Sequence, residues 1–117
     1  YPSVSCSQVH PGHGTQIEYF DPNGRAYLWY PGNSRAVPAL WKLEDFGGAY
    51  AICFKYPTRT YNPLTKQSGG KWDCARMGFW AKDITEVRSG DIFELTQGKL
   101  PHVLSRNQTT FDAILKK

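Results

Sequence analysis

The feature that most constrains the fold of this chain is a series of short segments in which large apolar residues occupy every second position. Over residues 49–56, for example, every second residue is Tyr, Ile or Phe, so one side of an extended chain would be heavily packed. The 117 residues also include 11 Gly and 8 Pro, which separate these segments as turns. Six segments are therefore predicted to be strands: Thr15–Phe20, Arg25–Tyr30, Val37–Glu44, Ala49–Tyr56, Lys71–Phe79 and Asp91–Thr96.

The connections between these segments predict an antiparallel arrangement. Asp21-Pro-Asn-Gly24 has the residues of a tight turn, so the first two strands should form a hairpin. The polar stretch 57–70 is interpreted as an exposed loop, and Ile84–Ser89 as a turn of helix. Strands in sequence order predict a mainly β fold, an antiparallel meander that forms a curved sheet or a small barrel.

The two ends of the chain differ from its middle. Residues 109–117 have the apolar spacing of a short amphipathic C-terminal helix. We assign residues 1–14 to an N-terminal lead-in segment and 15–117 to a single β-rich domain. The first residue is Tyr1 rather than Met. We interpret this as a sign that a signal peptide or an artificial boundary preceded it, which hints at export.

Charge and composition disfavour several classes of function. Fourteen Lys and Arg against ten Asp and Glu give a net charge of +4, and the basic residues are scattered rather than clustered. This pattern is typical of a solvated surface, so a nucleic-acid partner is not favoured. No apolar run reaches the roughly 18 residues of a membrane span. The phosphate-binding glycine motifs of nucleotide enzymes do not occur, and no cofactor is predicted.

Cys53 and Cys74 occupy two successive predicted strands. If these strands pair antiparallel around the loop, one register places the two cysteines directly opposite each other and also pairs the residues between them and the loop. Facing residues of such a pair lie about 4.5 to 5.5 Å apart, which is within reach of a disulfide. A disulfide between them would contribute about 3 kcal/mol to a small domain. The alternative is two buried free thiols in a cytosolic protein. A zinc site is disfavoured, because neither cysteine has a second ligand at a short spacing.

The stretch from Cys6 to His13 contains a thiol and two imidazoles within eight residues. Cys6, His10 and His13 could bind zinc or copper, which prefer such ligands. However, Pro and Gly between the histidines prevent a helical arrangement, and the spacing matches no structural zinc motif. We therefore interpret the stretch as an ordered or frayed lead-in with incidental histidines. Its cysteine is one of three in the chain and has no partner in the predicted disulfide, so it could be free, bridged to another molecule or metal-bound.

An acid–base hydrolase is a second interpretation, from a different class of function. His10, His13 or His102 with a nearby carboxylate could transfer protons or assist a metal. This hypothesis requires that at least two of these groups converge in a cleft. No sequence signature of a nucleophilic hydrolase is present, so we name no catalytic residue.

The aromatic residues are in clear excess, at 15% of the chain. In 25–30, Arg25, Tyr27 and Trp29 project to one face of the predicted strand, while Leu28 and Tyr30 project to the other. A sheet cannot bury all of these rings unless both faces are covered, so some could bind sugars or side chains of a partner. The other interpretation is that the four Trp fill the core. The expected binding surface comprises Arg25, Tyr27, Trp29, Arg35 and Trp41.

Several short motifs suggest a relationship. These are Phe20-Asp-Pro-Asn-Gly-Arg25, Trp41-Lys-Leu-Glu44, Cys53-Phe-Lys-Tyr56 and a later Cys74, followed by Gly90-Asp-Ile-Phe-Glu-Leu95. Over residues 20–104 the chain resembles small exported bacterial β-rich domains of unknown function, with a Gly-Arg turn, a Trp strand and a Cys-x-x-Tyr strand before a second Cys. The resemblance implies a periplasmic or secreted, non-enzymatic protein with a Cys53–Cys74 disulfide.

These observations together predict an exported binding or accessory domain. It would recognise a protein or glycan partner, or a cell-envelope component, through its aromatic and basic surface. A protein whose flat face caps a partner is a third possibility. The sequence does not specify the ligand or the oligomeric state.

Overall fold

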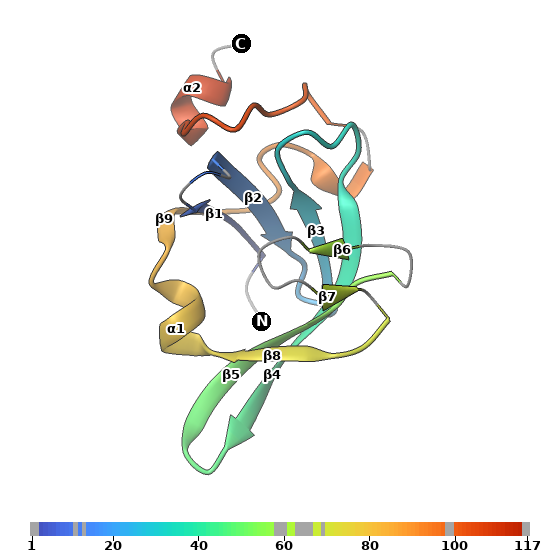
Figure 1. Ribbon diagram of the computed structural model, residues 1–117, viewed down its shortest axis with the longest axis vertical. Helices are drawn as coiled ribbons and strands as arrows, with labels where there is room; N and C mark the ends of the chain where they lie inside the picture. Colours follow the sequence, from blue (N-terminus) through green and yellow to red (C-terminus); the bar gives the residue numbers. More distant parts are fainter. Residues whose placement is uncertain are drawn as a thin grey trace.

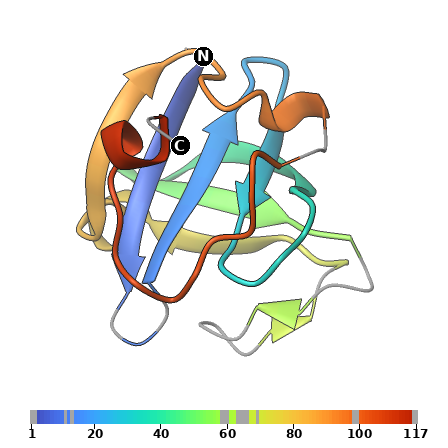
Figure 2. The same ribbon diagram turned by 90° about the horizontal axis from the view of Figure 1, so that it is seen from above.

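The computed structural model describes residues 3–10, 12, 14–57, 61–62, 67–68, 70–97 and 100–115. Seven antiparallel strands form one sheet that curls into a half-barrel, in the order β8-β5-β4-β3-β2-β1-β9 (Figures 1 and 2). The expectation of a mainly β fold with a curved antiparallel sheet is confirmed. The strands of this sheet are β1 (Val4–His10), β2 (Gly14–Phe20), β3 (Arg25–Trp29), β4 (Val37–Phe46), β5 (Ala49–Lys55), β8 (Asp73–Arg76) and β9 (Ile84–Ser89).

Five further short elements occur among the described residues. Strands β6 (Tyr61–Asn62) and β7 (Gln67–Ser68) form a separate two-stranded sheet within the predicted loop. Helix α1 (Met77–Ala81) connects the two edge strands β8 and β9, while the 3-10 helix η1 (Leu95–Gln97) and helix α2 (Phe111–Leu115) follow the sheet. The C-terminal helix falls within the predicted segment. Among the described residues, no helix is long and apolar enough to cross a membrane.

Three local predictions are wrong. Ile84–Ser89 is an edge strand rather than a helical turn, because it pairs with β1. Of Lys71–Phe79, only Asp73–Arg76 is a strand, because helix α1 begins at Met77. Asp91–Thr96 is not a strand, because the Asp91 carboxylate accepts hydrogen bonds from the backbone N–H groups of Leu95 and Thr96 and so closes a turn.

Residues 4–10 of the stretch assigned to the lead-in form strand β1, which lies between β2 and β9. The sequence does not predict this strand, because small polar residues rather than branched ones alternate along it. Ser5 and Ser7 are buried, and they are satisfied by hydrogen bonds to the Gly90 carbonyl and the Thr85 hydroxyl at 2.7 Å each. The strand is thus integral to the sheet.

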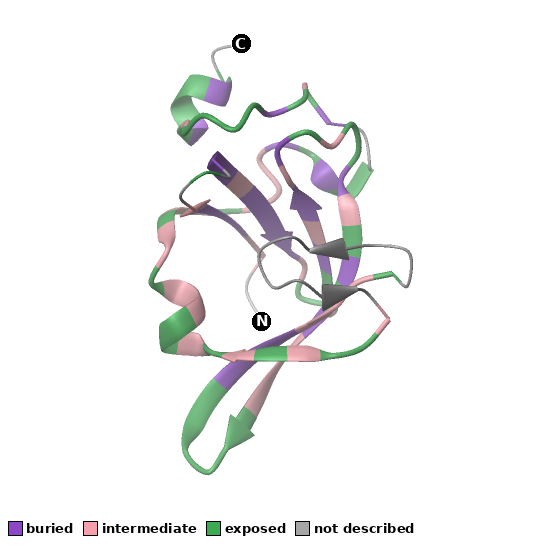
Figure 3. Ribbon diagram, viewed as in Figure 1, coloured by how far each residue is buried: buried purple, intermediate pink, exposed green. Residues whose placement is uncertain are grey.

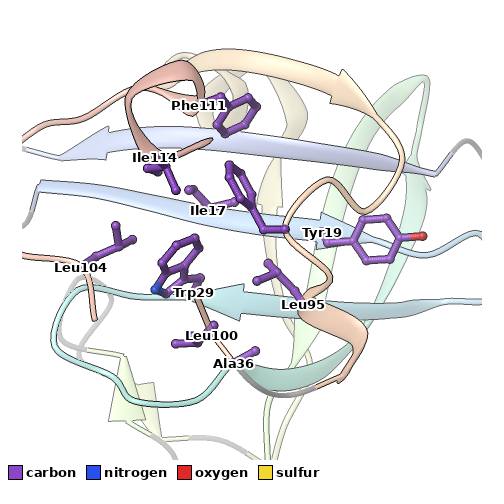
Figure 4. Packing of buried hydrophobic residues seen from close by; sticks show 10 residues of the cluster. Ile17, Tyr19, Trp29, Ala36, Leu95, Leu100, Leu104, Phe111 and Ile114 are labelled. Atoms are coloured by element: carbon purple, nitrogen blue, oxygen red, sulfur yellow. The ribbon is translucent and has the colours of Figure 1, made fainter. Parts of the chain in front are cut away.

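The sheet separates two hydrophobic clusters. The outer cluster contains Ile17 and Trp29, which are covered by residues from η1, α2 and the connection between them (Figures 3 and 4). The inner cluster lies within the curl and includes Cys6, Phe20 and Trp41. Alternation along each strand produces this division, since neighbouring residues point to opposite faces.

The predicted disulfide is present. Cys53 and Cys74 face each other across β5 and β8 and are bonded. The bond attaches the edge strand β8 to the sheet at the position expected from the register of the two segments. Cys6 is a buried free thiol.

Candidate functional site

An open groove of about 690 Å³ lies on the outer face of the sheet. Five of its lining residues belong to β2, β3 and the turn between them: Tyr19, Asp21, Asn23, Arg25 and Tyr27. The opposite wall is formed by Asp91 and Thr96, from the segment that follows β9. The volume is within the range of small-molecule sites, roughly 300 to 1,000 Å³.

The β2–β3 turn fixes the polar side chains at one end of the groove. Its backbone is closed by hydrogen bonds from the Asp21 N–H to the Arg25 carbonyl, at 2.8 Å, and from the Gly24 N–H to the Asp21 carbonyl, at 3.1 Å. Gly24 has a φ of 88°, which a residue with a side chain adopts at a cost. The indole N–H of Trp41 also donates to the Asp21 carbonyl, at 2.9 Å, and so attaches the turn to β4.

The opposite wall is equally well braced. One oxygen of the Asp91 carboxylate accepts from the Leu95 N–H at 2.8 Å, while the other accepts from the N–H and hydroxyl of Thr96 at 3.1 and 2.9 Å. Glu94, within this turn, has a φ of 55°, an uncommon conformation for a residue other than glycine. Both walls are therefore held by internal hydrogen bonds before any ligand arrives.

Two tyrosines, Tyr19 and Tyr27, are among the residues that line the groove. Tyr19 and Tyr27 are directly opposite each other on β2 and β3, with ring centroids 6.4 Å apart and planes inclined by 22°. Tyr19 is buried and its hydroxyl is 2.6 Å from the Ser3 hydroxyl, whereas Tyr27 is partly exposed. Figure 4 shows Tyr19 at one end of the outer cluster. The Tyr27 ring thus has a firm support and an accessible surface.

Only part of the predicted binding surface is brought together here. Arg25 and Tyr27 line the groove, while Arg35 is exposed but lies outside its lining. Trp29 is 0% exposed in the outer cluster, and Trp41 is 8% exposed in the inner cluster. The expectation that both tryptophans join an exposed surface is therefore wrong, because the C-terminal segment covers one and the curl of the sheet encloses the other.

Sequence reasoning missed five of the groove residues. Asp21 and Asn23 belong to the recognised turn, but their turn-forming chemistry gave no reason to expect a site. Tyr19 shares a face with Tyr27 across the predicted hairpin, so pairing the two strands could have found it. Asp91 and Thr96 could not be found, because the sequence predicts an extended strand over Asp91–Thr96, whereas the structure has a turn there.

A separate polar cluster is buried inside the curl. Glu18 is 4% exposed, and its carboxylate accepts a hydrogen bond from the Tyr56 hydroxyl at 3.0 Å. Burial raises the pKa of Glu18 to about 8, while the bond from Tyr56 opposes part of this shift. Cys6 is directly opposite Glu18, and burial, followed by that carboxylate, raises the pKa of the thiol to about 11.

The histidine candidates are dispersed. The Nδ1 atom of His10 is 3.7 Å from a carboxylate oxygen of Asp83. The ring of His102 packs edge-on against Trp29 of the outer cluster, with the two ring centroids 5.2 Å apart. Cys6 and His10 are four residues apart on one strand, which corresponds to about 13 Å. This separation is too long for one metal ion to bridge.

His13 lies outside the described residues. Within the part of the chain that the structure describes, no three Cys, His, Asp or Glu side chains form a metal-binding group.

Comparisons with known proteins give no further assignment: no family model, curated protein or solved structure matches the chain significantly. The resemblance to small exported bacterial domains therefore stays a prediction.

Proposed function

We propose that this protein is a binding domain that recognises a component of the bacterial cell envelope through the groove on β2 and β3. The observation that carries the proposal is the presence of Arg25 and Tyr27, an exposed cation and a partly exposed ring, in a groove whose walls are already fixed. In small-molecule sites, aromatic side chains provide contact area and a few precisely placed polar groups orient the ligand.

The groove is suited to binding for a second reason: the guanidinium of Arg25 is not bonded within the described part of the protein. Its side chain makes no hydrogen bond or ion pair with the described residues, although Asp21 and Asp91 line the same groove. An exposed guanidinium offers five donors in a planar arrangement. A ligand can therefore occupy these donors without first breaking an internal contact.

We further propose that the protein acts outside the cytoplasm, in the periplasm or as a secreted protein. The Cys53–Cys74 disulfide supports this compartment, because such bonds persist mainly in oxidising environments.

The proposal is tested by co-sedimentation of the chain with peptidoglycan sacculi and with outer-membrane vesicles from a Gram-negative bacterium. Arg25→Ala and Tyr27→Ala should each weaken binding about tenfold. The matched controls are Arg35→Ala and Tyr50→Ala, which remove an exposed residue of the same type outside the groove. If the parent chain sediments with neither material, the function is wrong. If the groove variants bind like the controls, the assigned site is wrong.

A further inference from the structure

The charges of the groove restrict the chemistry of its ligand. The charged residues that line it are one cation, Arg25, and two carboxylates, Asp21 and Asp91. Asp91 is occupied by three internal hydrogen bonds, and one oxygen of Asp21 accepts from the Asn23 N–H at 2.6 Å. The surplus negative charge opposes a phosphate or carboxylate, while the guanidinium opposes a cation. An uncharged ligand satisfies both conditions.

The ligand must also form its hydrogen bonds with side chains rather than with the backbone. Strands β2 and β3 are interior strands of the sheet, so their backbone groups in the paired segment are already bonded to neighbouring strands. An extended peptide that adds a strand needs an open edge, and the edge strands of this sheet are β8 and β9. The groove therefore presents a flat ring and polar side chains, which does not favour a peptide bound by strand addition.

The accessible groups combine donors, acceptors and an aromatic face. Arg25 provides donors only, the second oxygen of Asp21 accepts, and the Asn23 amide does both. A sugar ring presents hydroxyls, each a donor and an acceptor, around its edge and C–H groups on its faces. The edge can bond to the side chains of the rim, while a C–H face lies on the ring of Tyr27.

We infer that the groove binds an uncharged saccharide, with one sugar ring stacked on Tyr27 and its hydroxyls bonded to Arg25, Asn23 and Asp21. The inference rests on the proposed function, because it specifies the ligand of the same groove. The cavity of about 690 Å³ can hold a ligand larger than one sugar unit. The stacking surface is pre-formed, since Tyr27 is supported by Tyr19 and the walls are braced.

The test is a titration of the isotope-labelled chain, followed by NMR, with three neutral oligosaccharides: chitotetraose, maltotetraose and mannotetraose. At least one should produce saturable shifts confined to residues 19–27 and 91–96. Tyr27→Phe keeps the ring and should bind nearly as well as the parent, whereas Tyr27→Ala should bind about tenfold more weakly. Thermal unfolding of each variant shows whether it is folded, and Tyr50→Ala is the matched control for loss of an exposed tyrosine.

Two comparison ligands, tetraalanine and glucose 6-phosphate, separate the possible outcomes. Shifts in the groove with either of these but with none of the oligosaccharides would overturn the saccharide assignment, and so would no shift with any neutral oligosaccharide. Envelope binding that needs Tyr27 but is not displaced by the oligosaccharides would retain the proposed function and refute the ligand class. Oligosaccharide binding in the groove without envelope binding would retain the ligand class and refute the proposed function.

Discussion

Replacing the buried Glu18 by Gln should remove a large pH dependence of stability. In the unfolded chain the carboxyl has an ordinary pKa of 4.5, whereas in the folded protein burial raises it to about 8. Because the folded state holds its proton more tightly, the contribution to stability is complete below pH 4.5 and is lost as the pH rises through about 8. The difference between the two values corresponds to about 5 kcal/mol.

Glutamine is nearly isosteric with the protonated acid and keeps an oxygen that can accept the hydrogen bond from Tyr56. Glu18→Gln should therefore be close to the parent in stability at about pH 4.5 and more stable by several kcal/mol at about pH 8. This gain is comparable to the lower end of the total stability of a small domain, about 5 kcal/mol.

The measurement is urea unfolding at about pH 4.5, 6 and 8, followed by the fluorescence of the four tryptophans. The difference between parent and variant isolates Glu18, because the other titrating groups are common to both. Glu44→Gln removes a carboxylate from an exposed pair with Lys42 and should change stability by less than about 1 kcal/mol. Parallel stability curves for the parent and Glu18→Gln would refute the reasoning.

Three further outcomes are expected from the rest of the fold. Replacing Cys53 and Cys74 together by Ala should lower the free energy of unfolding by about 3 kcal/mol in urea, and an unchanged midpoint would contradict a structural disulfide. Cys6 should resist iodoacetamide in the folded protein and react once unfolded, because it is buried and its pKa is raised to about 11; mass spectrometry after rapid labelling decides this. Trp29→Ala should cost about 3 to 5 kcal/mol in thermal unfolding, and a loss below about 1 kcal/mol would show that its site is not a packed core.

The parts of the fold that could be predicted are those in which side chains alone decide the local structure. Alternating aromatic and branched residues in 49–56 are sufficient for a strand, and Asp21–Gly24 is sufficient for a turn. Strand β1 is different, because its buried Ser5 and Ser7 need partners that come from β9 and the turn after it. Tertiary hydrogen bonds of this kind leave no periodic signal in the strand itself.

The site could be predicted only on one side. The sequence predicts that Arg25 and Tyr27 share a face, because they are two residues apart on a strand, and both line the groove. The other wall depends on where the chain returns after β9, and Asp91 determines this by binding the backbone of Leu95 and Thr96. The residue pattern of this segment is that of a strand, although the segment forms a turn closed by the Asp91 carboxylate.

The same alternation that places Arg25, Tyr27 and Trp29 on one face does not make them equally accessible. Arg25 is exposed, Tyr27 is partly exposed and Trp29 is 0% exposed, so burial increases from residue to residue on this face of β3. The cause is the covering segment, since Phe93 packs on Trp29 at 5.5 Å between ring centroids. The segment that buries Trp29 also provides the second wall of the groove through Asp91 and Thr96. The groove therefore lies at the edge of the outer cluster, with which it shares Tyr19.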